Sequence, residues 1–203
     1  MILAYGGIPY QEEDCSSFFG MTFGEAKQSG KLPFGQLPLL QIGGEGGKLI
    51  AQSGSINRYL ASLVKTPGFY PTDPAELAFC DMIHETAQDI AKINPIVNVF
   101  RGEKFEQEKT EYFTNILPPK LKGLETILST KQFFCGDTVT YCDFAVYHQM
   151  DLCRLVDPEV FTKGGNIMQW MARVEKLPGI NGYLATRPEC VGIGVSPSLK
   201  PRT

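Results

Sequence analysis

The fold of this chain is decided by two segments, Phe34-Gly35-Gln36-Leu37-Pro38-Leu39-Leu40 and, a loop later, Gln52-Ser53-Gly54-Ser55-Ile56-Asn57-Arg58-Tyr59-Leu60. A Leu-Pro bond between apolar residues, directly before a strand-like run, predicts a rigid turn for which a cis peptide bond is an option. Gln-Ser then opens a helix-like run, and the first backbone N–H groups of a helix can bind an anion. The two segments therefore predict a turn followed by an anion-binding helix start.

The composition is that of an ordinary globular protein, with 43% apolar and 20% charged residues. A formal charge of −3 argues against a general electrostatic grip on nucleic acid or on an anionic membrane. No apolar run approaches the roughly 20 residues of a membrane span, and no cleavable signal precedes the first elements. We therefore expect a cytoplasmic protein with neither a nucleic-acid partner nor a membrane span.

The cysteines indicate neither a metal site nor a disulfide framework. They form no CxxC pair, and the two histidines, His84 and His148, do not complete a metal-ligand cluster, so no metal is expected. The even number leaves three disulfides as the alternative, but a chain of this length with a large core does not need them. We expect reduced, mostly buried thiols at Cys15, Cys80, Cys135, Cys142, Cys153 and Cys190.

The pattern of apolar residues predicts an α/β part over 1–65, a linker rich in Pro and Gly over 66–73, and an all-helical part over 74–203. In the first part we expect the end of a helix within 1–9, a short strand from Tyr10, and a polar loop over 15–30 with a helical turn at 24–28. A hairpin of 37–42 with 48–51 follows, and then a helix over 53–63. In the second part we expect helices at 74–99, 105–128, 141–155, 166–176 and 179–186.

A capping box begins one of these helices. Thr140 is the predicted N-cap, and Asp143, three residues later, can return the hydrogen bond. Val139 and Phe144 occupy the positions of a hydrophobic staple. We interpret this signal as structural rather than catalytic.

Four segments in this order resemble the cytosolic glutathione transferases, closest to the sigma type that includes the glutathione-dependent prostaglandin D synthases. The segment 2–10 resembles the end of the family's first helix, and 32–38 resembles its (L)PFGK(I/L)P segment. The segment 52–60 resembles its QSxAIxRYL segment, and 136–144 its capping segment. The resemblance implies a thioredoxin-like domain followed by a helical domain, a homodimer, and glutathione as co-substrate.

The resemblance also implies where glutathione lies. Leu37, before Pro38, would pair its backbone with the cysteinyl part of glutathione, as a strand does. Gln52 and Ser53 would bind the γ-glutamyl end, with its carboxylate at the helix start. Gln36 stands where the family often has lysine and would hydrogen-bond the glycyl end.

Three further site residues follow from the same resemblance. The segment 23–27 is similar to a WPEIK-like turn, so that Phe23 would wall the site and Lys27 would offer a cation to the glycyl carboxylate. Asp89 matches an acidic residue that reaches across the dimer to the γ-glutamyl amine. Such a contact would make the site depend on two chains.

The residue that activates the thiol is expected upstream of Met1. In sigma-like members a tyrosine at the end of the first strand donates a hydrogen bond to the glutathione thiolate, and relative to the family the chain lacks that strand and the helix start. Tyr5, Tyr10 and Cys15 do not match the catalytic position. An incomplete gene product and a degenerate homologue both account for this. No catalytic residue is therefore expected within the chain itself.

The expected function is conjugation of the glutathione thiolate to small hydrophobic electrophiles, or isomerisation of a lipid peroxide. One alternative is a catalytically inactive binding or assembly module on the same fold. Another is a cysteine-type thiol transferase or dehydroascorbate reductase, which requires a cysteine before Met1.

Overall fold

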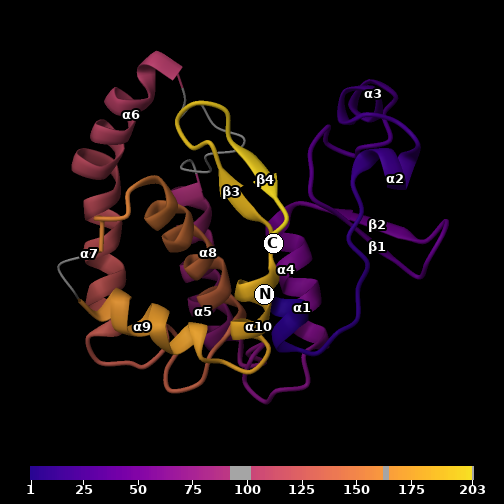
Figure 1. Ribbon diagram of the computed structural model, residues 1–203. Coiled ribbons are helices and arrows are strands. Elements are labelled where there is room, and N and C mark those ends of the chain that lie inside the picture. Colours follow the sequence, from indigo (N-terminus) through magenta and orange to yellow (C-terminus); the bar gives the residue numbers. More distant parts are fainter. Residues whose placement is uncertain (92–101, 162–164, 203) are drawn as a thin grey trace.

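The computed structural model describes residues 1–91, 102–161 and 165–202. Figure 1 shows a smaller lobe of short helices and one hairpin beside a larger lobe of helices, with α1 and α4 lying between the two. The smaller lobe contains α1 (Ile2–Tyr5), α2 (Cys15–Phe19), α3 (Phe23–Gln28), β1 (Leu39–Ile42), β2 (Lys48–Ala51) and α4 (Ser53–Leu63).

The predicted hairpin is confirmed, with its first strand shortened. The strands β1 and β2 pair antiparallel, with Leu39 opposite Ala51 and Ile42 opposite Lys48. The strand begins at Leu39 rather than at residue 37, because Pro38 has no N–H to donate to the ladder. The Leu37-Pro38 peptide bond is cis. Within the connection, Gly43 has φ 88°, a conformation that few other residues adopt.

The strand predicted from Tyr10 is wrong, since residues 10–14 have no regular structure. A strand needs a neighbour for its backbone groups, and no segment in the described part of the chain pairs with this one. The helical turn predicted at 24–28 is confirmed as α3, whereas α2 lies in a part that was predicted to be loop. Asp14 caps α2 through the Ser17 N–H, and Thr22 caps α3 in a capping box with Glu25.

The larger lobe follows the predicted order of helices. It contains α5 (Pro74–Ile90), α6 (Phe105–Glu111), α7 (Leu117–Leu128), α8 (Tyr141–Val156), α9 (Asn166–Glu175) and α10 (Ile180–Thr186), with a 3₁₀ turn at Gly102–Lys104. The helix predicted over 74–99 is described only as far as Ala91, and the rest of that prediction lies outside the described residues. A second hairpin, β3 (Glu189–Val191) with β4 (Ser198–Lys200), was not predicted.

The single helix predicted over 105–128 is interrupted by a π-helical turn at Tyr112–Ile116. Pro118 and Pro119 follow this turn in the first positions of α7. Because proline has no N–H, neither residue can donate to the carbonyl four residues earlier, and the regular α-helical ladder cannot continue there. The wider π turn joins α6 to α7 without ending the helical path.

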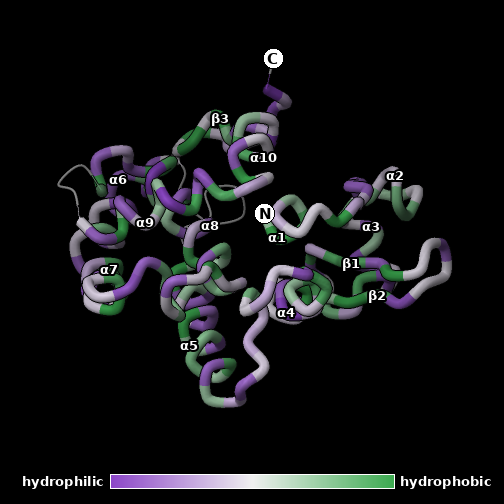
Figure 2. Tube along the Cα trace, turned by 90° about the horizontal axis from the view of Figure 1, so that it is seen from below, coloured by the Kyte–Doolittle hydropathy of each residue, from purple (hydrophilic) through white to green (hydrophobic). Residues whose placement is uncertain are grey.

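The core of the larger lobe is built around α8, which packs on α5, α9 and α4. Trp170, Tyr141 and Tyr147 are fully buried there. Figure 2 shows α8 among the other helices of the larger lobe, and most residues of α8 are buried. No helix in the described residues is long and apolar enough to cross a membrane.

The predicted capping box of α8 is confirmed. The Thr140 N–H donates to Asp143 Oδ2 over 2.8 Å, and the Thr140 hydroxyl donates to the same oxygen over 2.9 Å. The other carboxylate oxygen accepts from the indole Nε1–H of Trp170 over 2.9 Å and from the Phe134 N–H over 3.1 Å. This buried carboxylate therefore joins the start of α8 to α9 and to the preceding loop.

Candidate functional site

The turn before β1 presents backbone groups that have no partner in the described part of the chain. Pairing with β2 begins only at Leu39, and no hydrogen bond to the Leu37 backbone is formed by the described residues. The Leu37 side chain is 50% exposed, so the turn lies at the surface. A free N–H and C=O next to a strand can pair with an extended peptide.

The start of α4 is the second component. Gln52 has φ 71° and ψ 116°, and among the described residues it alone has a positive φ without being glycine. Such backbone strain persists where the surroundings impose it and is found at ligand sites. Ser53 follows as the first helical residue, half-buried, and its hydroxyl has no hydrogen bond to any described residue. The first N–H groups of the helix and this hydroxyl are therefore available to an anion.

The hairpin register brings these two components together. Leu39 pairs with Ala51, so Pro38 and Gln52 each lie one residue beyond the same end of the ladder. The free backbone of Leu37 and the start of α4 are consequently at one end of the hairpin. Of the predicted site residues, Leu37, Pro38, Gln52 and Ser53 form this group.

Lys27 and Phe23 belong to α3, which borders the same turn. A side-chain carbon at Gly35 would lie 3.3 Å from Lys27 Cε, so the lysine stem crosses the turn directly before Gln36. Gly35 has φ 64°, which favours glycine independently of this close approach. Phe23, at the start of α3, is 46% exposed. A cation and an amide therefore border the turn.

Asp89 lies elsewhere in the described contacts. It is on α5, it is 71% exposed, and its carboxylate is 3.3 Å from the Nζ atom of Lys120 on α7. No contact joins Asp89 to the group at the hairpin end among the described residues. Its predicted role across a dimer stays a prediction.

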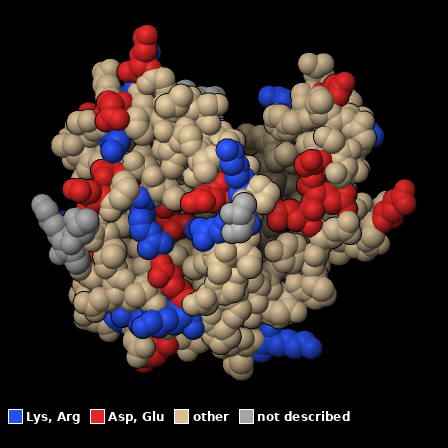
Figure 3. Space-filling model, in the orientation of Figure 1, with Lys and Arg blue, Asp and Glu red and all other residues tan. Residues whose placement is uncertain are grey.

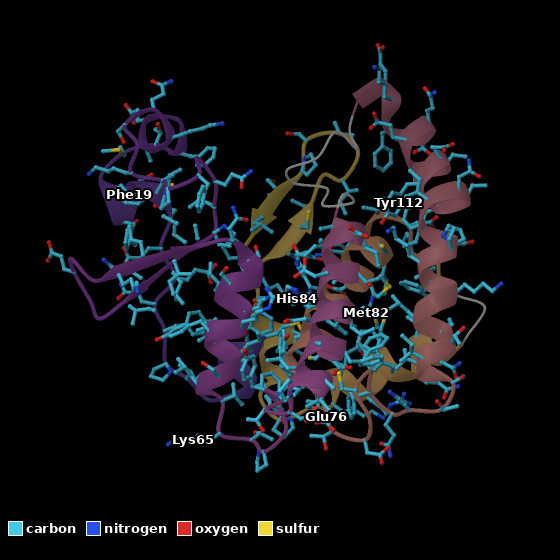
Figure 4. All side chains as sticks on the ribbon, turned by 180° about the vertical axis from the view of Figure 1, so that it is seen from behind. Phe19, Lys65, Glu76, Met82, His84 and Tyr112 are labelled. Carbon is cyan, nitrogen blue, oxygen red and sulfur yellow. The ribbon has the colours of Figure 1, made fainter. Side chains whose placement is uncertain are left out.

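A polar contact between α4 and α5 supports the helix that carries Ser53. Arg58 donates to Asp81 over 2.7 Å and to Glu85 over 2.6 Å. His84 is fully buried between the two helices, where its Nε2 lies 3.2 Å from Asn57 Nδ2, and Figure 4 shows it in this position. Burial, reinforced by the Arg58 charge, lowers the pKa of His84, which keeps the ring neutral.

The same contact lowers the pKa values of two carboxylates. Burial alone would raise the pKa of Asp81, but hydrogen bonds from Tyr141 and Arg58 outweigh it and hold this pKa below its usual value. The hydrogen bond from Arg58 lowers the pKa of Glu85. These groups were not predicted, because the link spans residues far apart in the sequence.

The structure also brings together three cysteines whose spacing in the sequence did not predict a cluster. The Sγ atoms of Cys80, Cys135 and Cys142 lie within 4.8 Å of one another. The six thiols of the chain are free; Cys80, Cys142 and Cys153 are buried, and the others are half-buried. No short-range motif signals this cluster, since Cys80 comes from α5 and the other two flank the start of α8.

Basic side chains are not gathered into a single patch on the face of the molecule that Figure 3 shows. Lys and Arg side chains are interspersed with Asp and Glu over the face that Figure 3 shows. The same face is hollowed between the part that carries α2 and α3 and the helical lobe. This arrangement agrees with a small ligand bound beside the smaller lobe.

A thioredoxin-like domain with one cis-proline turn, followed by an all-helical domain, is the fold of the glutathione transferases. The family model for the glutathione S-transferase C-terminal domain matches residues 89–187. Hematopoietic prostaglandin D synthase of Gallus gallus is 30% identical over 192 residues, which cover 93% of this chain and 88% of that protein. A glutathione S-transferase of Dirofilaria immitis is 31% identical over 159 residues, which cover 76% of this chain and 72% of that protein.

Comparison with solved structures supports the same family. Rat hPGDS complexed with a quinoline superposes with a TM-score of 0.76 at 25% identity, covering 93% of this chain and 89% of that one. The pi-class glutathione S-transferase of Onchocerca volvulus superposes with a TM-score of 0.70 at 25% identity, covering 90% and 83%. The chain belongs to the glutathione S-transferase family. Homodimers and a role in detoxification are typical of this family.

Proposed function

We propose that this chain binds glutathione at the end of the β1–β2 hairpin and transfers its thiolate to small hydrophobic electrophiles. The observation that supports this best is the joint position of two components. The unpaired Leu37 backbone and the start of α4 at Gln52 and Ser53 lie at one end of the same ladder. Glutathione is a short peptide with a carboxylate at each end, which is the ligand that a free strand edge and a helix start suit together.

In this proposal each component holds one part of glutathione. The Leu37 backbone pairs with the cysteinyl residue, while Gln52 and Ser53 bind the γ-glutamyl carboxylate. Lys27 and Gln36 hold the glycyl carboxylate, and Phe23 shields the bound peptide from water. Asp89 reaches the γ-glutamyl amine of glutathione on a second copy of the chain, which makes the active form a homodimer. We propose the cytoplasm as its location.

The chemistry needs a thiolate. A free thiol has a pKa of about 8.5, and lowering it by two units takes about 2.7 kcal/mol of differential stabilisation. Tyr5 does not supply the hydroxyl, because its ring packs 5.1 Å from that of Phe69 and 5.4 Å from that of Phe144, between the two lobes. We propose that a hydroxyl donor other than Tyr5 stabilises the glutathione thiolate.

Two measurements on the protein test the proposal. Calorimetric titration with glutathione should show binding, and the dipeptide Cys-Gly should bind far more weakly because it lacks the γ-glutamyl carboxylate. Conjugation of chlorodinitrobenzene should then release chloride at a rate that depends on glutathione. Failure of both would end the proposal.

Binding without turnover would instead favour the inactive binding or assembly module. Reduction of dehydroascorbate through a mixed disulfide would favour the cysteine-type thiol transferase. The same preparation serves all three assays, so the three functions are separated by one set of measurements.

A further inference from the structure

The three-cysteine cluster lies inside the helical lobe, apart from the residues proposed to bind glutathione. Cys80 is on α5, Cys142 is the second residue of α8, and Cys135 is in the loop between α7 and α8. The Sγ atoms of Cys135 and Cys142 are 3.7 Å apart, and all three Sγ atoms lie within 4.8 Å of one another. Cys80 and Cys142 are fully buried, whereas Cys135 is half-buried and connects the cluster to the surface.

The cluster is held in place by the surrounding fold. The helices α5 and α8 pack directly on each other, which fixes Cys80 and Cys142. The loop that carries Cys135 is closed by two backbone hydrogen bonds between Phe133 and Gly136, of 2.8 and 3.1 Å. Asp143 fixes the same loop through the Phe134 N–H. The three thiols are therefore preorganised rather than brought together by a ligand.

The sulfur spacing is that of a trigonal metal site. With a metal–thiolate distance of about 2.3 Å, three sulfurs around one ion in a plane lie about 4 Å apart. The spacing of 3.7 Å between Cys135 and Cys142, and of at most 4.8 Å within the set, needs only small side-chain movements to reach this arrangement.

The ligand set distinguishes among thiophilic ions. Thiolates select monovalent copper and zinc among the common metals. Structural zinc takes four ligands in a tetrahedron, and no fourth cysteine, histidine or carboxylate joins the cluster within the described residues. The Thr140 hydroxyl lies 3.2 Å from Cys142 Sγ but is engaged with Asp143. A buried set of three sulfurs therefore suits monovalent copper, which is satisfied by three soft ligands.

One feature of the fold favours negative charge on these sulfurs. The N-terminus of α8, which carries the positive end of the helix dipole, lies at Cys142. The Thr140 hydroxyl at this N-terminus lies 3.2 Å from Cys142 Sγ.

The thiols of Cys80, Cys135 and Cys142 lose their protons to solvent as their sulfurs bind the ion. We propose that Cys80, Cys135 and Cys142 form a binding site for one monovalent copper ion in trigonal sulfur coordination. The proposal is independent of the proposed transferase function.

The test is a titration of the reduced protein with Cu(I) under anaerobic conditions, in competition with a colorimetric Cu(I) chelator. One ion per chain should bind, and X-ray absorption should show three sulfur neighbours. Cys135→Ser should weaken binding by more than about 100-fold, since even outer-shell changes at metal sites cost 10–100-fold. Cys190→Ser, a half-buried cysteine on β3 outside the cluster, should bind within about twofold of the wild type.

Three results of these measurements would overturn the proposal, and a fourth comes from competition with zinc. They are a Cys135→Ser variant that binds as tightly as the wild type, an equal loss in Cys190→Ser, and a wild-type absorption spectrum with nitrogen or oxygen neighbours. Complete displacement of the copper by equimolar Zn²⁺ would also refute the trigonal assignment. The absorption spectrum is recorded on the wild type, so the test stands even where a variant folds poorly.

Discussion

Arg58 on α4 donates a hydrogen bond from Nε to Oδ1 of Asp81 on α5 over 2.7 Å. The same guanidinium reaches Glu85 one turn further along α5 over 2.6 Å, and the Tyr141 hydroxyl donates to Asp81 from α8. The side chain of Arg58 is 29% exposed, so the link is partly shielded from solvent. One cation therefore joins the helix that begins at Ser53 to the two central helices of the larger lobe.

Replacing Arg58 with methionine should destabilise the protein by about 1–3 kcal/mol, because two carboxylates lose a charged hydrogen-bond donor. The methionine keeps much of the apolar stem, so that the loss of stability measures the contribution of the guanidinium. Urea unfolding followed by far-ultraviolet circular dichroism gives the free energy.

Lys120→Met is the matched control for this ion pair. It removes the Lys120–Asp89 pair, whose carboxylate is 71% exposed, and exposed pairs contribute at most about 1 kcal/mol. If the two variants lose the same amount of stability, the link between α4 and α5 contributes no more than an exposed ion pair.

How far the sequence determines the fold varies from one element to another. The helix predicted over 141–155 forms as Tyr141–Val156, because a capping box and many buried apolar side chains act together there. The same kind of signal, Thr22 with Glu25, begins α3, and it could have been recognised in advance. The interruption of the 105–128 helix could also have been recognised, since Pro118 and Pro119 are visible in the sequence. The absence of a strand at Tyr10 could not, because a strand depends on a neighbour that local pattern does not show.

The candidate site was predictable in its parts but not in its assembly. Local motifs identify Leu37 and Ser53, yet only the pairing of Leu39 with Ala51 places them at one end of the hairpin. Side-chain clusters formed by residues far apart in the sequence have no local sequence motif. Cys80 meets Cys135 through the packing of α5 on α8, and no spacing rule predicts that contact.

Ser53→Ala should weaken glutathione binding by about tenfold to a hundredfold, because a hydrogen bond to a carboxylate is worth about 1.5–3 kcal/mol. The stability of the free protein should stay the same, since the Ser53 hydroxyl has no hydrogen bond to a described residue. Calorimetric titration of both proteins with glutathione makes the comparison.

Ser55→Ala serves as the control, because Ser55 is exposed on the same first turn of α4. It should bind glutathione within about twofold of the wild type. If the two alanine variants bind equally well, Ser53 does not hold the ligand.

Substitution to alanine is expected to change the stability of the protein in opposite directions at Gly54 and at Gly123. A side-chain carbon at Gly54 would lie 3.0 Å from Arg58 Nη1 and 3.3 Å from Cε1 of the buried His84. Arg58 is held by two carboxylates and cannot move away freely. Gly54→Ala should therefore cost about 1–2 kcal/mol, as overpacking does.

Gly123, in α7, has no atom within 4 Å of the added carbon. Alanine should stabilise this helix by about 0.5–1 kcal/mol. Thermal and urea unfolding of both variants show whether each substitution raises or lowers the free energy of unfolding. A stabilised Gly54→Ala variant would show that His84 does not pack against α4 in solution.

The pH dependence of Asp143 provides the last test. Burial raises the pKa of this carboxyl to about 6, against the opposing effect of its four hydrogen bonds. The unfolded chain has a value of about 3.9. Between these values the folded protein binds the proton more tightly than the unfolded chain, so this group favours folding increasingly as the pH falls from 7 to 4, by up to about 3 kcal/mol.

Asp143→Asn should be less stable than the wild type at pH 7, by about 2–4 kcal/mol, because an amide cannot accept all four hydrogen bonds. It should also lack the proton-linked gain, so the difference between the two proteins should widen as the pH falls to 4. Asp81 and Glu85, whose pKa values are lowered, lose stability on acidification in both proteins and cancel from that difference. The exposed Asp137→Asn variant should track the wild type at every pH. A difference that narrows on acidification would mean that the hydrogen bonds outweigh burial and hold the Asp143 pKa below its usual value.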